Sequence, residues 1–429
     1  MKKYLSTVLF FLFMATGLPV HAQTKEVKAL NEKFFLLYDQ ENYTDAAITA
    51  KKLLELARKR GEYHLDMANV LNKLALIDER QGNYTAAERL YRRALAIREK
   101  LLGKNHPLVA TLLNNLAQNY HAQARYAEAE SLNMRALTIR VKAYGSDATA
   151  VSVSLNNLAA IFEDQGKYFE AEALFRRALA NDEKALHPND PNLALTMGNL
   201  ARTLSAQEKY TEAESLYRGA LLILEKSSDP PVTLKSTVLI NLAELLVHQG
   251  KYAEAETLQA SSLANLEKAL GPRHPDVAAA LVNLGMLYRK QRKLANAERL
   301  ILRALAIFED ALGPYHPQVA SVLNNLALIH NEQGDSADVE ALYKRALAIR
   351  EKALGPDHPY VAECMDNLAS FYVEKNKYAE AEALYKRALE IWLKVHDPDH
   401  HAVVIDRKKL ADLYRKTNRE DEAIALEKK

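Results

Sequence analysis

The sequence predicts an all-α protein, an array of about ten repeats in which each repeat forms a pair of helices. The main support is a fixed period, because successive tyrosines lie 42 residues apart at Tyr84, Tyr126, Tyr168, Tyr210 and Tyr252. A Leu-Ala pair keeps the same register from repeat to repeat. The 14 glycines and 13 prolines among 429 residues are too few for a collagen-like or low-complexity chain.

We predict that residues 1–22 are a secretory signal peptide. Two lysines precede an apolar run over residues 5–18, and Ala22 ends a predicted cleavage site. The run is short for a membrane span of about 20 residues, although an uncleaved anchor is the alternative. Cleavage would leave Gln23 as the first residue. We therefore expect export to the periplasm or beyond, with no membrane insertion after cleavage.

The repeat register divides the rest of the chain into three parts. Residues 23–63 form a degenerate N-terminal repeat or cap, residues 64–399 form eight 42-residue repeats, and residues 400–429 form a truncated C-terminal repeat or cap. Atypical ends are expected in a solenoid, because the terminal repeats must present one face to water.

Each repeat is predicted to form two helices. In residues 106–144, Pro107 suits a first helical turn, and Leu113, Leu116 and Tyr120 share one apolar stripe of a helix. Gly145 then suits a helix end. A small residue follows the repeated tyrosine by three positions, which indicates that the two helices cross closely. It recurs at Ala87, Ala129, Ala171, Ala213, Ala255, Ala297, Ala381 and Ala423.

The repeated motifs resemble those of the tetratricopeptide repeat. They are Asn-Leu-Ala, then Gln-Gly-Lys-Tyr-x-Glu-Ala, then Tyr-x-Arg-Ala-Leu. The usual family period is about 34 residues. The 42-residue period, with Leu-Gly-Pro-x-His-Pro at residues 312–317 and 354–359, resembles the kinesin light chain subtype. This resemblance implies a right-handed superhelix whose first helices line a concave groove for peptides or partner proteins. It implies no catalytic chemistry and no cofactor.

An asparagine stands one residue before the Leu-Ala or equivalent pair in seven repeats. These are Asn115, Asn157, Asn199, Asn241, Asn283, Asn325 and Asn367. The position lies about 150° from the apolar stripe of its helix, so it does not face the partner helix of its own repeat. By resemblance, it lines the peptide-binding groove. The alternative is a ladder between neighbouring first helices, which a second asparagine at Asn72, Asn114, Asn156 and Asn324 would extend.

Histidines recur at His64, His106, His274, His316, His358 and His400. Neighbouring repeats lie roughly 10 Å apart, whereas zinc ligands lie at about 2 Å, so one ion cannot collect these side chains. Most precede proline, and we expect them to cap helices. His396, His400 and His401 are closer together and suit a surface metal or, as we prefer, an exposed linker, so no metal site is assigned.

The lone cysteine, Cys364, falls at an apolar position of the repeat. A small core residue is expected there, and a reactive thiol that crosslinks a partner is the alternative.

The charges argue against nucleic acid as a partner, because 57 basic residues face 55 acidic ones. Basic pairs such as Arg92-Arg93, Arg176-Arg177 and Lys386-Arg387 share helices with glutamates, and we expect solvated i,i+4 ion pairs. No phosphate loop, nucleophile elbow or metalloprotease motif is present.

The sequence therefore predicts an exported, non-enzymatic scaffold that binds an extended peptide or partner segment. A structural subunit of a cell-envelope assembly, which would use the outer surface or the ends of the array, is the alternative. An enzyme with an unrecognised site is a third.

Overall fold

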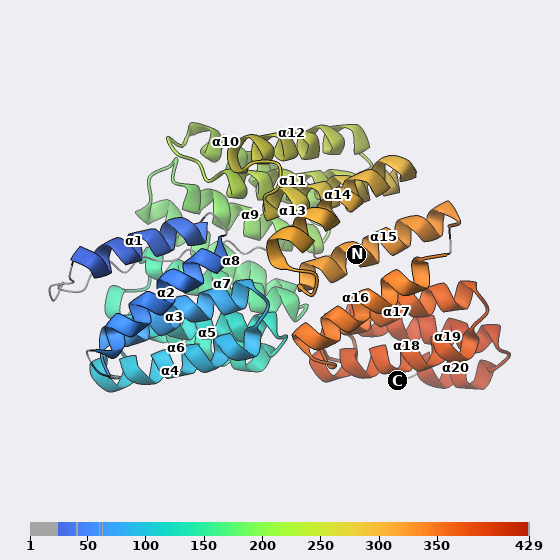
Figure 1. Cartoon of the computed structure of the whole chain (residues 1–429). Helices are drawn as coiled ribbons and strands as arrows, with labels where there is room; N and C mark the ends of the chain where they lie inside the picture. Colours follow the sequence, from blue (N-terminus) through green and yellow to red (C-terminus); the bar gives the residue numbers. More distant parts are fainter. Residues whose placement is uncertain (1–24, 40–41, 60, 62, 336, 428–429) are drawn as a thin grey trace. The chain divides into compact units, whose positions relative to one another are not determined.

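The computed structural model describes residues 25–39, 42–59, 61, 63–335 and 337–427, and these ranges hold twenty α-helices and no strand (Figure 1). The predicted signal peptide over 1–22, its cleavage site and the new N-terminus at Gln23 lie outside the described residues and stay predictions. No helix among the described residues has the length and apolar character needed to cross a membrane.

Helices alternate between first and second members of a hairpin. The first helices are α1 (Lys25–Asp39), α3 (Leu65–Arg80), α5 (Pro107–Ala122), α7 (Thr149–Asp164), α9 (Pro191–Ala206), α11 (Val232–His248), α13 (Pro275–Lys290), α15 (Pro317–Gln333), α17 (Pro359–Glu374) and α19 (His401–Lys416). The second helices are α2 (Tyr43–Arg58), α4 (Tyr84–Leu102), α6 (Tyr126–Tyr144), α8 (Tyr168–Ala185), α10 (Tyr210–Lys226), α12 (Tyr252–Leu270), α14 (Leu294–Leu312), α16 (Val339–Leu354), α18 (Tyr378–Val395) and α20 (Glu420–Glu427). The predicted all-α repeat of helical hairpins is thereby confirmed.

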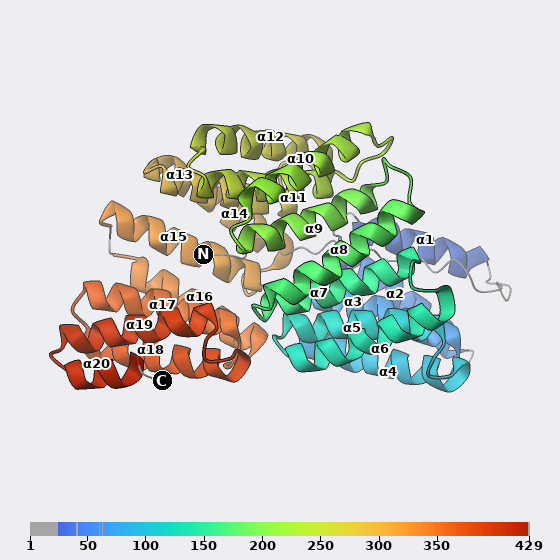
Figure 2. The ribbon, with the colours of Figure 1, turned by 180° about the vertical axis from the view of Figure 1, so that it is seen from behind.

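The chain forms two compact units. Of the described residues, those within 25–162 and 173–186 belong to the N-terminal unit, and those within 163–172 and 187–427 belong to the C-terminal unit. Within the C-terminal unit, each hairpin from α9 to α20 packs on the next along the chain, and successive first helices also touch each other from α9 to α17. The last two hairpins, α17–α18 and α19–α20, lie side by side in both views (Figure 2).

The small residue after each tyrosine lies where the two helices of a hairpin cross. All eight alanines predicted for this position are fully buried. At Gly285 the approach is closer still, because an added Cβ would lie 3.0 Å from Cδ1 of Ile301 and 3.3 Å from the carbonyl oxygen of Ala297. A larger side chain would therefore push α13 and α14 apart.

The repeated histidines cap the first helices, as predicted. The ring nitrogen Nδ1 of His106 accepts a hydrogen bond from the Leu108 amide at 3.2 Å, and His64, His274, His316, His358 and His400 cap in the same way. An Nδ1 acceptor requires a neutral imidazole, so these caps act only when the ring is uncharged. Gly145 ends α6 with a φ of 84°, which favours glycine.

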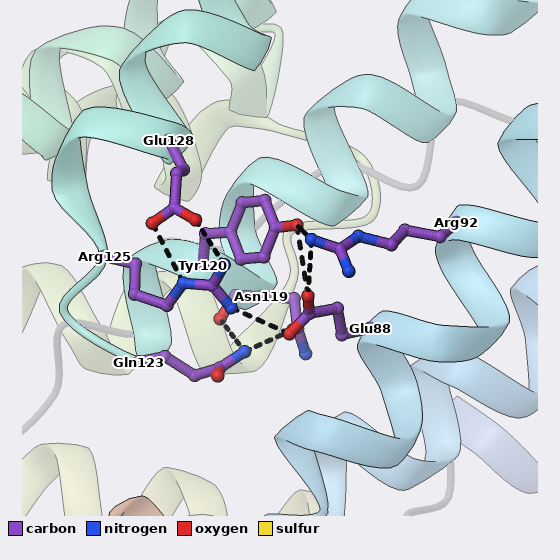
Figure 3. Close-up of polar contacts among 7 residues, drawn as sticks. All are labelled: Glu88, Arg92, Asn119, Tyr120, Gln123, Arg125 and Glu128. Atoms are coloured by element: carbon purple, nitrogen blue, oxygen red, sulfur yellow. Dashed lines mark hydrogen bonds and ion pairs between the residues drawn. The ribbon is translucent and has the colours of Figure 1, made fainter.

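A polar clamp joins six of the hairpins to the next. In the N-terminal unit, Glu88 of α4 accepts a hydrogen bond from Arg125 Nη1 at 2.8 Å and another from the Tyr120 hydroxyl at 3.2 Å (Figure 3). The glutamate holds a basic residue 37 positions later, and the same spacing recurs in five further pairs. These are Glu172–Lys209, Glu214–Lys251, Glu256–Lys293, Glu340–Lys377 and Glu382–Arg419. The clamp fixes the register of one hairpin on the next.

The charges of the second helices pair both within and between repeats. Glu88 and Arg92 form the predicted i,i+4 pair at 2.9 Å, as do Glu382 and Lys386 at 2.6 Å. The prediction is wrong for Arg387, which instead reaches Glu351 of the preceding repeat at 2.8 Å. Stacked second helices bring that acid within reach, and three other arginines do the same. They form the pairs Arg135–Glu99, Arg303–Glu267 and Arg345–Glu309.

Candidate functional site

The seven repeated asparagines are buried or half-buried on the first helices. Asn157, Asn199 and Asn325 are buried, whereas Asn115, Asn241, Asn283 and Asn367 are half-buried. A half-buried amide on a helix surface is open to a ligand as well as to a neighbour. Which of the two it meets depends on the residue that the adjacent first helix places beside it.

The ladder bond is seen at one asparagine of the series, Asn115, whereas Asn114, 43 residues before Asn157, has no hydrogen-bond partner for its buried side-chain atoms among the described residues. Asn115 on α5 donates from Nδ2 to Oδ1 of Asn72 on α3 at 2.8 Å, across a separation of 43 residues. The same separation places Lys409 Nζ on α19 3.0 Å from Oδ2 of Asp366 on α17. We call the position of the repeated asparagine, which Lys409 takes in the last repeat, the row position. A residue at the row position contacts the residue 43 positions earlier. We call this earlier residue the ladder slot.

Three asparagines in the C-terminal unit have ladder slots that cannot bond them. The slots for Asn241, Asn283 and Asn325 hold Gly198, Ile240 and Val282, which have no polar side-chain atom. The Nδ2 atoms of Asn283 and Asn325 are buried and find no hydrogen-bond partner among the described residues. An amide donor left in this state costs about 1–3 kcal/mol, so this part of the row is the best candidate for ligand contact.

Lysines occupy the row position at both ends of the asparagine series. In the N-terminal unit, Lys73 Nζ lies 4.9 Å and 3.9 Å from the ring centroids of Phe34 and Phe35 of α1. Burial lowers the pKa of Lys73 to about 8. In the C-terminal unit, Lys409 forms ion pairs with the buried side chains of Asp366 and Asp406. Neither end offers a free amide, which confines the candidate site to the repeats between them.

A buried acid pair that sequence reasoning missed lies between the last two repeats. Lys409 Nζ lies 3.0 Å from Asp366 and 3.4 Å from Asp406, and both aspartates are buried. Burial, followed by the charge of Asp366, raises the pKa of Asp406 to about 9. The only sequence signal was an acid at Asp366 where four other repeats have asparagine. Asp406 comes from a different helix, so the pair depends on stacking.

The other candidates from the sequence have structural positions. Cys364 is fully buried in an apolar cluster, and burial raises the pKa of its thiol to about 11, which leaves little thiolate to react. The rings of His396 and His400 stack in parallel with centroids 3.7 Å apart. Across the ranges that the structure describes, no group of three or more His, Cys, Asp or Glu side chains is arranged to hold a metal ion.

Comparison with known proteins identifies the repeat. The family model of the tetratricopeptide repeat matches residues 28–100, 66–141, 150–226, 234–308, 276–352, 340–391 and 362–429. No curated protein matches the sequence.

Solved structures similar to the chain include proteins of the kinesin light chain type. BtubC (BKLC) from P. vanneervenii is 25% identical over 56% of this chain and 93% of its own, with a TM-score of 0.43. A putative kinesin light chain with nearly identical TPR-like repeats, from Podosopora anserina, is 25% identical over 48% of this chain and 97% of its own, with a TM-score of 0.39. A monomeric mutant of IFIT1 with Gppp-AAAA covers 93% of this chain and 89% of its own at 14% identity, with a TM-score of 0.52. This last likeness concerns the fold alone.

Proposed function

Because the chain belongs to the tetratricopeptide repeat family, we propose that it is an exported, non-catalytic scaffold that binds an extended peptide or a segment of a partner protein. The proposed site is the first-helix face around Asn241, Asn283 and Asn325. The observation that carries the proposal is the unmet hydrogen bonding of Nδ2 in Asn283 and Asn325, together with the ladder slots of all three asparagines, which are glycine, isoleucine and valine.

Asparagine suits the backbone of an extended peptide. Each side-chain amide has a donor and an acceptor, as does each peptide unit of a ligand. An extended chain advances about 3.3 Å per residue, and neighbouring repeats lie roughly 10 Å apart, so each repeat would meet every third ligand residue. Contacts of this kind hold the backbone and tolerate many side chains.

A triple variant tests the site. Replacing Asn241, Asn283 and Asn325 by alanine removes three bonds worth about 0.5–1.5 kcal/mol each, so binding should weaken by roughly 1.5–4.5 kcal/mol if the contributions add. Peptides selected by the wild-type protein from a random phage-displayed library serve as probes, and calorimetry measures their affinity. The melting temperature should stay close to that of the wild type, because these amides lack ladder partners.

The matched control is a ladder variant. Asn115→Ala removes a bond seen in the structure, and it should lower the melting temperature while leaving peptide affinity unchanged. Unchanged affinity in a stably folded triple variant would contradict the proposed site.

Export is proposed from the predicted signal peptide alone. Mass spectrometry of the protein recovered from outside the cytoplasm should show an N-terminus at Gln23. A full-length chain that stays in the membrane fraction would refute cleavage and favour the uncleaved anchor.

A second candidate function is a subunit of a cell-envelope assembly. It is favoured by apolar side chains exposed on the last hairpin, namely Val404, Ile405 and Ile424. Changing Val404 and Ile405 to lysine should then release the protein from a stoichiometric complex isolated from envelope extract. A complex that survives this change would argue against this use of the last hairpin.

A further inference from the structure

We infer that the ligand of this face carries one basic residue followed, in steps of three residues, by two apolar residues. This inference rests on the proposed function and names the kind of peptide it would select. It comes from the residue three positions after each row asparagine, one turn along the same face of the helix. In four successive repeats of the C-terminal unit this residue is Glu244, Met286, Leu328 and Ser370.

The middle two positions are apolar and partly open. Met286 and Leu328 are half-buried and pack against the core clusters beneath them. The residues four positions before Asn283 and Asn325 are Ala279 and Ser321, which have small side chains. An apolar ligand side chain laid over Met286 or Leu328 would remove apolar surface of both partners from water. Methionine also adapts its shape to different ligands.

Glu244 differs from the other acids of this face. It is exposed, and within the described residues it forms no ion pair. Glu332, by contrast, pairs with Arg289 and Arg292, and Glu374 accepts a hydrogen bond from Asn331 at 2.8 Å. The carboxylate that remains available to a ligand cation is therefore that of Glu244.

One cation of the protein competes for Glu244. Lys290 lies on the next first helix, where burial lowers its pKa and the charge of Glu244 opposes that shift. The two charged groups form no ion pair within 4.0 Å in the described chain, so the carboxylate can still accept a ligand ammonium. Lys290 will weaken the preference for a basic residue without removing it.

The spacing follows from the geometry of stacking. With roughly 10 Å between repeats, a ligand in the polyproline II conformation, which rises about 3.1 Å per residue and has three residues per turn, presents side chains three residues apart on one face to neighbouring positions of this column. The predicted pattern is Lys-x-x-Leu-x-x-Leu, in one of the two chain directions. Ser370, in the following repeat, is polar and uncharged, so it selects neither an apolar nor a charged ligand residue.

The test compares designed peptides on the full mature chain. Fluorescence anisotropy is measured for Lys-x-x-Leu-x-x-Leu, its reversed sequence, and versions in which lysine becomes glutamate or both leucines become serine, with alanine and glycine at the spacer positions. One direction of the Lys-Leu-Leu peptide should bind best. Replacing its lysine by glutamate should weaken binding several-fold, and replacing both leucines should weaken it by roughly tenfold or more.

Charge reversal in the protein is the decisive step. Glu244→Lys should reverse the preference, so that the glutamate peptide binds better than the lysine peptide. Glu390→Lys, on the exposed surface of α18, changes the net charge equally and should leave the preference unaltered. Met286→Ser with Leu328→Ser should abolish the advantage of the leucine peptide, with circular dichroism confirming the fold.

The outcomes separate this inference from the proposed function. If Glu244→Lys leaves the preference unchanged while the triple asparagine variant loses library peptides, the inferred motif is wrong and the peptide site stands. If neither library peptides nor designed peptides bind the wild-type chain, both are overturned.

Discussion

Replacing Asp406 by asparagine should remove a pH dependence from the stability of the last repeat. Two buried carboxyl groups, Asp366 and Asp406, face the single ammonium of Lys409. One ammonium balances one carboxylate, so the second carboxyl group is favoured in its protonated form. Asparagine resembles a protonated aspartic acid in size and polarity, and its amide oxygen still accepts a hydrogen bond from Lys409.

The magnitude follows from the raised pKa of Asp406. Burial and the charge of Asp366 raise this pKa from 3.8 to about 9 in the folded chain. Between these values the folded state holds a proton that the unfolded state has released. The stabilisation is therefore complete below pH 3.8 and is lost as pH rises toward 9, at about 1.4 kcal/mol per pH unit. From pH 6 to pH 8 this amounts to about 2.7 kcal/mol.

Trp392 provides a local assay. It is the only tryptophan of the chain, and it packs against the core cluster that includes residues of α19. Its fluorescence during urea unfolding, recorded at pH 6, 7 and 8, reports the stability of this region. Asp406→Asn should flatten the dependence on pH, whereas Asp412→Asn, an exposed change on the same helix, should preserve it.

Two results would refute this reasoning. One is a wild-type free energy of unfolding that does not fall between pH 6 and pH 8. The other is an Asp406→Asn variant whose stability changes with pH as steeply as that of the wild type. Either result would mean that the pair does not hold an extra proton in the folded state.

Four further predictions concern the helix caps, the ladder, the clamp and the repeat. Burial lowers the pKa of His274, so its cap stabilises the fold above pH 6.5 and fails as pH falls below it; His274→Asn, a cap that does not titrate, should remove this loss in melts on both sides of pH 6.5. Asn72→Ala leaves Asn115 without its partner and should lower the free energy of unfolding by about 1–3 kcal/mol, with peptide affinity unchanged as the control. Glu256→Ala removes the acceptor of one clamp and should cost about 1 kcal/mol in urea unfolding, less in high salt. Deleting residues 148–189, one period, should leave a shorter folded array, and loss of all helical circular dichroism would contradict the repeat register.

The features that depend on neighbours in sequence were predictable. A histidine that precedes the first helix caps an amide two residues later, so its role follows from local sequence. The same holds for the alanines at the helix crossings, which lie three residues after the repeated tyrosine, and for Gly145 at the end of α6. Helix pairing within a hairpin followed from the apolar periodicity of each repeat.

The features that depend on stacking were harder to predict. Arg387 has no acid four residues away on its own helix, and it bonds Glu351 of the preceding repeat. The clamp from Glu88 to Arg125 joins two residues of the repeat motif that the sequence alone does not connect. Both pairings depend on the distance between hairpins and on their register. The periodicity of a single helix gives neither quantity.

The asparagine row shows where sequence and tertiary structure divide. The sequence by itself determined that an asparagine recurs on the first helices and that it faces away from the partner helix of its own repeat, because helical periodicity fixes direction within a helix. Only the tertiary structure decided that the residue 43 positions earlier stands beside it, because that offset is set by how one first helix packs on the next. The offset gives Asn115 a polar neighbour and gives Asn241, Asn283 and Asn325 apolar ones. The same repeated residue therefore bonds its neighbour in one part of the array and lacks a polar ladder slot in another, where we propose that a ligand binds.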